Sequence, residues 1–181
     1  TEDAPIIINY NIYGTKMEYQ PGKHWLLGTI YAPLREEFQN VVYEPQKKVK
    51  YIFVSTGGSD QFSLASSIVE YLELRTMAKD LTFHVVSGKL NSNYASLQQL
   101  ALKYGNVEIH HNVEKMSELM KQCDLAISAA GSTMYELCAV GIPTICFSYA
   151  ENHDLVIRYF TQDEYAFYGG SFELGRNMLL E

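Results

Sequence analysis

Small, hydroxyl-bearing residues gather at one point of the stretch from Cys123 to Ala150. Gly131, Ser132 and Thr133 form a predicted tight turn that directly follows the short apolar run Leu125–Ser128. Helix formers come next, so a helix is expected to begin at this turn. The first turn of a helix has unpaired backbone N–H groups and the positive end of the helix dipole. Together with two hydroxyl groups, these favour a phosphate-binding site.

An acidic residue, Glu136, follows one turn into the same predicted helix. Its carboxylate can accept hydrogen bonds from the two neighbouring hydroxyls of a ribose. Thr133 and Glu136 also have the spacing of a capping box, which satisfies a helix start without any ligand. The spacing alone is compatible with both interpretations.

A second glycine-rich turn, containing Gly57, Gly58 and Ser59, comes directly after the predicted strand Tyr51–Ser55. Glycines there allow the backbone to approach a diphosphate closely, and the Ser59 hydroxyl can donate a hydrogen bond to it. The alternative is an ordinary strand-to-helix turn, which favours glycine and in which Asp60 only caps the helix.

A third turn runs from His110 to Met116, between a strand end and a helix. His110 and His111 point in opposite directions in an extended chain, so we expect no metal shared between them. The loop can contact a nucleotide base through its backbone groups, and a plain surface turn is the alternative. No ligand cluster in the sequence indicates a metal, and no other cofactor is expected.

Strand-like apolar runs alternate with helical segments after Lys48. The alternation predicts an α/β fold, a Rossmann-like parallel sheet with helices on both faces. The three turns then fall on the carboxyl edge of one sheet, where ligands of such folds bind, and this favours the binding interpretations. The predicted strands are Tyr51–Ser55, Phe83–Val86, Val107–His110, Leu125–Ser128 and Thr144–Phe147.

The first forty-odd residues contain too little regular apolar pattern to form a core of their own. A buried strand is expected at Pro5–Asn9, a short strand at Trp25–Gly28, and a short helix that begins at Pro33. We therefore expect residues 1–44 to be a remnant of an amino-terminal domain with a linker, and residues 45–181 to be the Rossmann-like domain. Both ends are expected to lie inside a longer protein.

Composition narrows the class of protein further. The chain has 181 residues, 47% of them hydrophobic and 19% charged, which suits a globular domain with a good core. Its net charge of −7 argues against a nucleic-acid partner, and its apolar runs are too short for a membrane span. Cys123, Cys138 and Cys146 are odd in number and have apolar neighbours, so we expect buried free thiols and a cytoplasmic location.

Three segments resemble the UDP-sugar hydrolase of pseudaminic acid biosynthesis and the related spore-coat polysaccharide biosynthesis proteins. They are Leu26–Phe38 (LLGTIYAPLREEF), Val54–Asp60 (VSTGGSD) and the long stretch His110–His153. The peptidoglycan lipid-II N-acetylglucosaminyltransferase has the same layout more loosely. The resemblance implies the carboxyl-terminal domain of a glycosyltransferase-B fold, which binds the nucleotide diphosphate. In this family the amino-terminal domain supplies the catalytic histidine.

The resemblance also assigns roles to individual positions. It implies a diphosphate loop at Gly58 and Ser59, a phosphate-binding helix start at Ser132 and Thr133, and a ribose-binding acid at Glu136. Asn112 to Met116 corresponds to the uracil-side loop. His153 stands where the family usually has glutamine, at a position on the sugar or diphosphate side. The predicted nucleotide-binding residues are Gly57, Gly58, Ser59, Asn112, Val113, Met116, Gly131, Ser132, Thr133 and Glu136, with Asn152 and His153 on the sugar side.

The glycine-rich loop and the histidine of the family's amino-terminal domain have no counterpart in these residues. We therefore assign no catalytic residue to this chain and expect it to bind its ligand without turnover. Its expected partners are a UDP-sugar or UDP and the missing amino-terminal domain. Two functions stay open: the nucleotide-sugar-binding half of a hydrolase or transferase of surface-polysaccharide synthesis, or a non-catalytic nucleotide-sugar binding or partner module.

Overall fold

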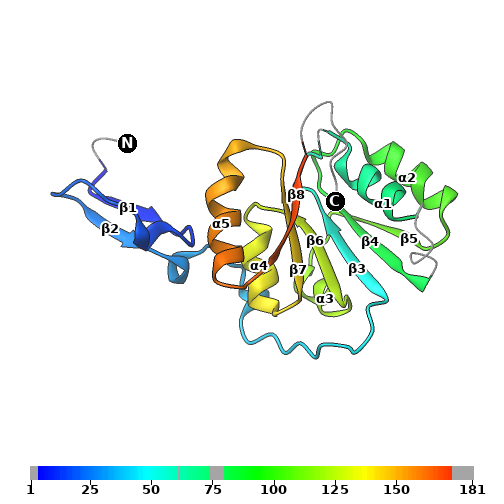
Figure 1. Ribbon diagram of the computed structural model, residues 1–181, viewed down its shortest axis with the longest axis horizontal. Coiled ribbons are helices and arrows are strands. Elements are labelled where there is room, and N and C mark those ends of the chain that lie inside the picture. The colour runs from blue at the N-terminus through cyan, green and yellow to red at the C-terminus, as the bar shows by residue number, and fades with distance from the viewer. Residues whose placement is uncertain (1–3, 61, 74–79, 173–181) are drawn as a thin grey trace.

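The main body of the protein is a six-stranded, all-parallel sheet (Figure 1). The computed structural model describes residues 4–60, 62–73 and 80–172. The strand order is β5-β4-β3-β6-β7-β8, which confirms the predicted Rossmann-like parallel sheet. The strands are β3 (Tyr51–Ser55), β4 (Thr82–Ser87), β5 (Val107–His111), β6 (Leu125–Ala129), β7 (Thr144–Ser148) and β8 (Phe167–Ser171).

Helices cover both faces of this sheet (Figure 1). They are α1 (Leu64–Glu73), α2 (Tyr94–Lys103), α3 (Met116–Lys121), α4 (Thr133–Val140) and α5 (Asp154–Gln162). Side chains alternate between the two faces along each strand, so Ile52 and Val54 pack with α1 and α2, whereas Phe53 packs with α3, α4 and α5. Among the described residues, no helix has the length and apolar character needed to cross a membrane.

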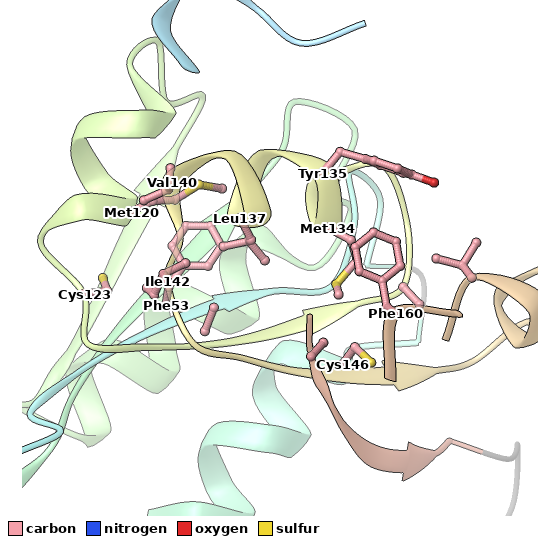
Figure 2. Close-up of a cluster of buried hydrophobic side chains, with 14 of the residues drawn as sticks. Phe53, Met120, Cys123, Met134, Tyr135, Leu137, Val140, Ile142, Cys146 and Phe160 are labelled. Atoms are coloured by element: carbon pink, nitrogen blue, oxygen red, sulfur yellow. The ribbon is translucent and has the colours of Figure 1, made fainter. Parts of the chain in front are cut away.

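The core on the α4 face contains large side chains from both the strands and the helices (Figure 2). Phe53 of β3 and Cys146 of β7 pack under Met134 and Leu137 of α4, and Phe160 of α5 completes the cluster. Burial of one such large apolar side chain stabilises the fold by about 1.5–3 kcal/mol. This packing fixes the position of α4 over the centre of the sheet.

The strand order reverses direction between β3 and β6. These neighbouring strands are in register at Ser55 and Ser128, near their carboxyl ends. After β3 the chain continues to β4 on one side, and after β6 it continues to β7 on the other side. The loops that leave the two strands therefore diverge, and in open α/β folds ligands bind at such a reversal of strand order.

The amino-terminal segment forms a separate, two-stranded parallel sheet of β1 (Ile6–Asn9) and β2 (His24–Leu27). The strand expected at Pro5–Asn9 is present as β1, but the expectation that it is buried is wrong, because Ile6 and Ile8 are 56% and 57% exposed. Two strands are too few to cover their own apolar side chains. The segment between the two strands contacts the main body through the N–H of Ile12, which donates to the Tyr135 hydroxyl at 3.1 Å.

The short helix expected to begin at Pro33 is also wrong. The segment contains only a 3-10 turn, η3 (Glu36–Phe38), and Arg35 before it is extended with φ −65° and ψ 153°. Tertiary contacts override the local helical preference, because Phe38 is buried in the core and Glu37 accepts a hydrogen bond from the N–H of Ser117.

All three cysteines are free thiols, as expected. Cys123 and Cys146 are buried, and burial raises their thiol pKa values to about 12 and about 11. The expectation that Cys138 is buried is wrong, because it is exposed. It follows Leu137 on α4, and each residue of a helix is rotated by about 100° from the previous one, so Cys138 turns away from the sheet.

Candidate functional site

Two of the predicted binding turns lie side by side at the carboxyl edge of the sheet. Gly57, Gly58 and Ser59 follow β3, and Gly131 and Ser132 follow β6, which is the neighbouring strand. Gly58, Ser59, Gly131 and Ser132 are exposed. The reversal of strand order thus brings together two segments that are more than seventy residues apart in the sequence.

The start of α4 has free hydrogen-bonding capacity. The N–H groups of Met134 and Tyr135 donate to the carbonyl oxygens of Gly131 and Ser132, at 3.1 Å each. The N–H groups of Ser132 and Thr133 have no partner among the described residues. Ser132 is the N-cap residue and its hydroxyl makes no capping hydrogen bond. The first turn of α4 therefore presents amide and hydroxyl donors at the same edge of the sheet.

The turn after β3 packs backbone against backbone. Gly57 has φ +93°, a left-handed conformation that favours glycine. A Cβ atom added to Gly88 would lie 2.6 Å from the carbonyl oxygen of Gly58, so the loop after β4 supports the turn only because Gly88 has no side chain. An added Cβ at Gly58 itself meets no atom within 4 Å, so the outer side of this turn is open.

Asp60 anchors the same turn from inside the protein. Its Oδ1 atom accepts hydrogen bonds from the N–H groups of Leu64 at 2.8 Å and Ala65 at 3.4 Å, which confirms the capping interpretation for this residue. Burial raises the pKa of the Asp60 carboxyl group. Gly58 and Ser59, which precede this cap in the sequence, are exposed.

Buried polar atoms without a hydrogen-bond partner gather beneath this edge. In the described part of the chain, four of the five such atoms belong to β4 or to the loops that follow β3 and β4. Buried polar atoms without a protein partner are commonly satisfied by ordered water or by a bound group. The four atoms are Thr56 Oγ1, Asp60 Oδ2, Ser87 Oγ and Asn91 Nδ2.

Glu136 is held by the amino-terminal segment. Its Oε1 atom forms an ion pair with Nη2 of Arg35 at 3.1 Å, and Nη1 of Arg35 contacts Glu37 at 2.6 Å. Because α4 begins at Thr133 and its N-cap makes no side-chain hydrogen bond, the capping box considered for Thr133 and Glu136 is not formed. Burial raises the pKa of Glu136, and Arg35 acts in the opposite direction.

The third predicted turn reaches the same side of the sheet. Asn112 has φ +53° and its N–H donates to the carbonyl oxygen of Ser87 at 3.2 Å. Val113 and Met116 are half-buried against the core on the α4 face. The carbonyl oxygen of Glu114 accepts a hydrogen bond from Arg35 at 3.4 Å. Arg35 therefore connects this loop with Glu136.

Asn152 and His153 lie in a 3-10 turn, η5 (Glu151–His153), after β7. Asn152 is exposed, whereas His153 is buried, and its ring packs edge-on against Tyr149 with centroids 4.7 Å apart. Burial lowers the pKa of His153 and favours its neutral form. A binding role for these two residues stays a prediction.

Tyr149 is a candidate that the sequence analysis missed. A Cβ atom added to Gly57 would lie 3.3 Å from the Tyr149 hydroxyl, so this side chain connects the turn after β3 with η5. The sequence could have indicated Tyr149 only through its position, because it directly follows the last residue of β7 at the carboxyl edge of the sheet.

A second missed group is the set His84, Glu108 and His110 on β4 and β5. Their ligand atoms all lie within 4.8 Å of one another. Prediction of this group from the sequence requires the register of the two strands, which pairs His84 with Glu108.

A shallow groove of about 860 Å³ lies elsewhere, between the segment 43–48 and the end of α3. Tyr51 and Asp124, which line it, are at the amino-terminal ends of β3 and β6. The groove is therefore on the edge of the sheet opposite to the predicted binding turns.

Three relatives cover different parts of this sequence. An uncharacterised protein of Methanocaldococcus jannaschii is 33% identical over 67% of the chain and 26% of its own length. The spore coat polysaccharide biosynthesis protein SpsG of Bacillus subtilis is 24% identical over 93% of the chain and 47% of its own length. A Helicobacter pylori protein, named as a pseudaminic acid cytidylyltransferase and UDP-2,4-diacetamido-2,4,6-trideoxy-beta-L-altropyranose hydrolase, is 28% identical over 81% of the chain and 26% of its own length.

The chain thus spans from about a quarter to about half of the length of these relatives. Among solved structures, the glycosyltransferase SnogD of Streptomyces nogalater has a similar fold, with a TM-score of 0.50 and 20% identity over 83% of this chain and 39% of that one. The sequence of residues 51–158, which runs from β3 into α5, matches the glycosyltransferase family 28 C-terminal domain. The protein belongs to this family.

Proposed function

We propose that the carboxyl edge of the sheet binds the nucleotide diphosphate of a UDP-sugar. The observation that carries this proposal is the adjacency of the two turns that follow β3 and β6. In the proposed complex, the diphosphate lies against Gly58 and Ser59 on one side and against Ser132 and Thr133 on the other. The unpartnered amides at the start of α4 supply the donors.

Helix dipoles and backbone amides provide the positive potential that this site requires. The chain carries a net charge of −7, and the predicted diphosphate residues include no lysine or arginine. The amino-terminal end of a helix carries about half a positive charge, and α4 points this end at the site. An acidic domain can bind an anion in this way.

Glu136 and the loop Asn112–Met116 are proposed to hold the nucleoside. The Glu136 carboxylate accepts hydrogen bonds from the ribose hydroxyls, and the loop contacts the uracil through its backbone. Arg35 contacts both Glu136 and the carbonyl oxygen of Glu114, so the two elements are close enough in space to form one nucleoside site. Asn152 and Tyr149 lie next along the edge and are proposed to face the sugar.

For the whole protein, we propose the donor-binding half of an enzyme of surface-polysaccharide synthesis, with the reacting group supplied by a further, amino-terminal domain. The names of the SpsG and Helicobacter pylori relatives, and the family match, support this role. Hydrolysis of the sugar-phosphate bond and transfer of the sugar both use this donor site.

Calorimetric titration with UDP, UMP and uridine tests the proposal. We expect saturable binding of UDP, weaker binding of UMP and still weaker binding of uridine, because the diphosphate supplies most of the contacts. Absence of UDP binding at millimolar concentration, which corresponds to about −4 kcal/mol, would rule the site out.

Matched glycine variants locate the diphosphate. In Gly58→Ala and in Gly131→Ala, the added Cβ atom meets no protein atom within 4 Å, so each variant is expected to fold normally. The same Cβ atom prevents the diphosphate from approaching the backbone closely. Each is expected to reduce UDP affinity by about tenfold or more. Gly105→Ala, which also meets no atom within 4 Å and lies on the opposite edge of the sheet before β5, is the control. Equal affinities in all three variants would contradict the assignment.

A further inference from the structure

Three side chains capable of metal binding meet on the two strands at one edge of the sheet. His84 lies on β4, and Glu108 and His110 lie on β5. Nδ1 of His84 and Nε2 of His110 share a hydrogen bond of 2.9 Å, whose proton a bound metal ion would displace. Oε2 of Glu108 lies 3.5 Å and 3.9 Å from these two nitrogen atoms. The group is separate from the residues proposed to bind the nucleotide.

Strand geometry explains why the three side chains converge. Phe83, Val85 and Val107 pack into the core with α1 and α2, so the alternate residues of both strands point to the other face of the sheet. The parallel register places His84 directly opposite Glu108. His110 follows two residues later on the same face. Backbone hydrogen bonds between β4 and β5 thus place the three residues next to one another on one face of the sheet.

The spacing of the three ligand atoms fits a small metal ion. A circle through points separated by 2.9, 3.5 and 3.9 Å has a radius of about 2.0 Å. Zinc is bound by imidazole nitrogen at about 2.0–2.1 Å and by carboxylate oxygen at about 2.0–2.2 Å. An ion slightly out of the plane of the triangle therefore lies about 2.1 Å from all three atoms and leaves its far side open for a fourth ligand.

The surroundings suit a partly open zinc site. The His84 side chain is buried, with its ring 5.7 Å from that of Tyr51, whereas Glu108 is exposed and His110 half-buried. Solvent can therefore provide a fourth ligand to complete a tetrahedron.

Ligand chemistry selects the class of metal. Two imidazoles and one carboxylate favour zinc and related divalent transition metals over magnesium or calcium, which prefer oxygen ligands. We propose that His84, Glu108 and His110 form a Zn²⁺ site that joins β4 to the edge strand β5.

Titration of the purified, metal-free protein with Zn²⁺ tests the site directly. We expect one Zn²⁺ per chain from calorimetry, with a Kd of about 10 µM or lower. His84→Gln and His110→Gln are each expected to weaken binding by about tenfold or more. His111→Gln, next in sequence but with its ring 4.3 Å from Tyr94, is the matched control, and Cys138→Ser controls for the exposed thiol. Both controls should bind Zn²⁺ like the wild type.

A third variant, Glu108→Gln, tests the same site even if a histidine variant fails to fold. The Glu108 side chain is 59% exposed, so its replacement should leave the fold unchanged. Zn²⁺ should raise the Tm of the wild type and raise that of Glu108→Gln distinctly less. Wild-type affinity in the Glu108, His84 and His110 variants, or loss of binding in Cys138→Ser, would overturn the proposal. Absence of any binding at about 100 µM Zn²⁺ would overturn it as well.

Discussion

Arg35 and Glu136 are 101 positions apart in the sequence, yet Nη2 of Arg35 lies 3.1 Å from Oε1 of Glu136. The proposed ribose-binding acid therefore has a partner within the protein itself. The Arg35 side chain is 45% exposed, and ion pairs of this kind contribute about 0–1 kcal/mol. Ribose hydroxyls can compete with such a partner.

Replacement of Glu136 by glutamine is expected to weaken UDP binding. The change keeps the length of the side chain but removes a charged acceptor, and hydrogen bonds to charged groups contribute about 1.5–3 kcal/mol. UDP affinity should fall by roughly ten- to a hundredfold in calorimetry. Uridine should show a similar relative loss, because the ribose is unchanged. Wild-type affinity in this variant would remove Glu136 from the site.

Removal of the Arg35 charge should make UDP binding more sensitive to acid. Burial raises the pKa of Glu136 and Arg35 lowers it, so Arg35→Met moves the pKa of Glu136 further upward. Protonated Glu136 is a poorer acceptor, and the affinity ratio of wild type to variant should be larger at pH 5.5 than at pH 8. Lys16→Met, which removes an exposed lysine paired with Asp163, is the control. The same ratio at both pH values would contradict the expectation.

Gly88→Ala should displace the turn after β3, because the loop that contains Gly88 packs against this turn. The new Cβ atom would lie 2.6 Å from the carbonyl oxygen of Gly58, so the two loops must separate. Such overpacking costs about 1–3 kcal/mol of stability, measured by urea unfolding, and UDP affinity should fall with it. Gly105→Ala serves again as the control for both measurements. Unchanged stability in Gly88→Ala would show that the loops adapt freely.

Truncation of Leu137 should destabilise the domain strongly. Leu137 is completely buried between α4 and the sheet (Figure 2), and Leu→Ala changes in a core cost about 2–5 kcal/mol. Leu102→Ala on α2 removes the same atoms from a side chain that is 79% exposed, so it should cost little. Chemical denaturation of both variants gives the two values. Similar losses would place Leu137 outside the core.

Acid should weaken the fold in part through His153. Its pKa in the folded protein is lowered from 6.5 by burial, so the unfolded chain binds a proton more readily. The associated stability is present above pH 6.5 and is lost as the pH falls below it toward the folded-state pKa. His153→Gln should therefore lose less unfolding free energy between pH 7 and pH 5.5 than the wild type. Equal losses would mean that His153 ionises freely in the fold.

The central sheet was predictable because its strands are strongly apolar and regularly spaced. Tyr51–Ser55 was predicted with the bounds that the structure gives. The sixth strand, β8, was missed because Gly169 and Gly170 interrupt it and because Phe167 and Tyr168 are exposed at the edge of the sheet. A strand of this kind is recognised only from its pairing with β7.

The candidate site was predictable as far as it depends on local turn chemistry. Gly58 and Ser132 were assigned from the residues around them, and the parallel topology then placed their turns together. Arg35 was not assigned, because its approach to Glu136 depends on how the amino-terminal segment packs. The convergence of His84 with His110 depends likewise on strand register, which no local pattern specifies.

Two consecutive residues of α4 are held by the first 38 residues of the chain: Tyr135 by the N–H of Ile12 and Glu136 by Arg35. If UDP draws Glu136 away from Arg35, ligand binding and the packing of that segment are reciprocally coupled. The segment then acts as an internal competitor. Any partner or motion that pulls residues 10–35 from α4 would raise the affinity of the edge for its nucleotide, by the same factor by which the nucleotide loosens the segment.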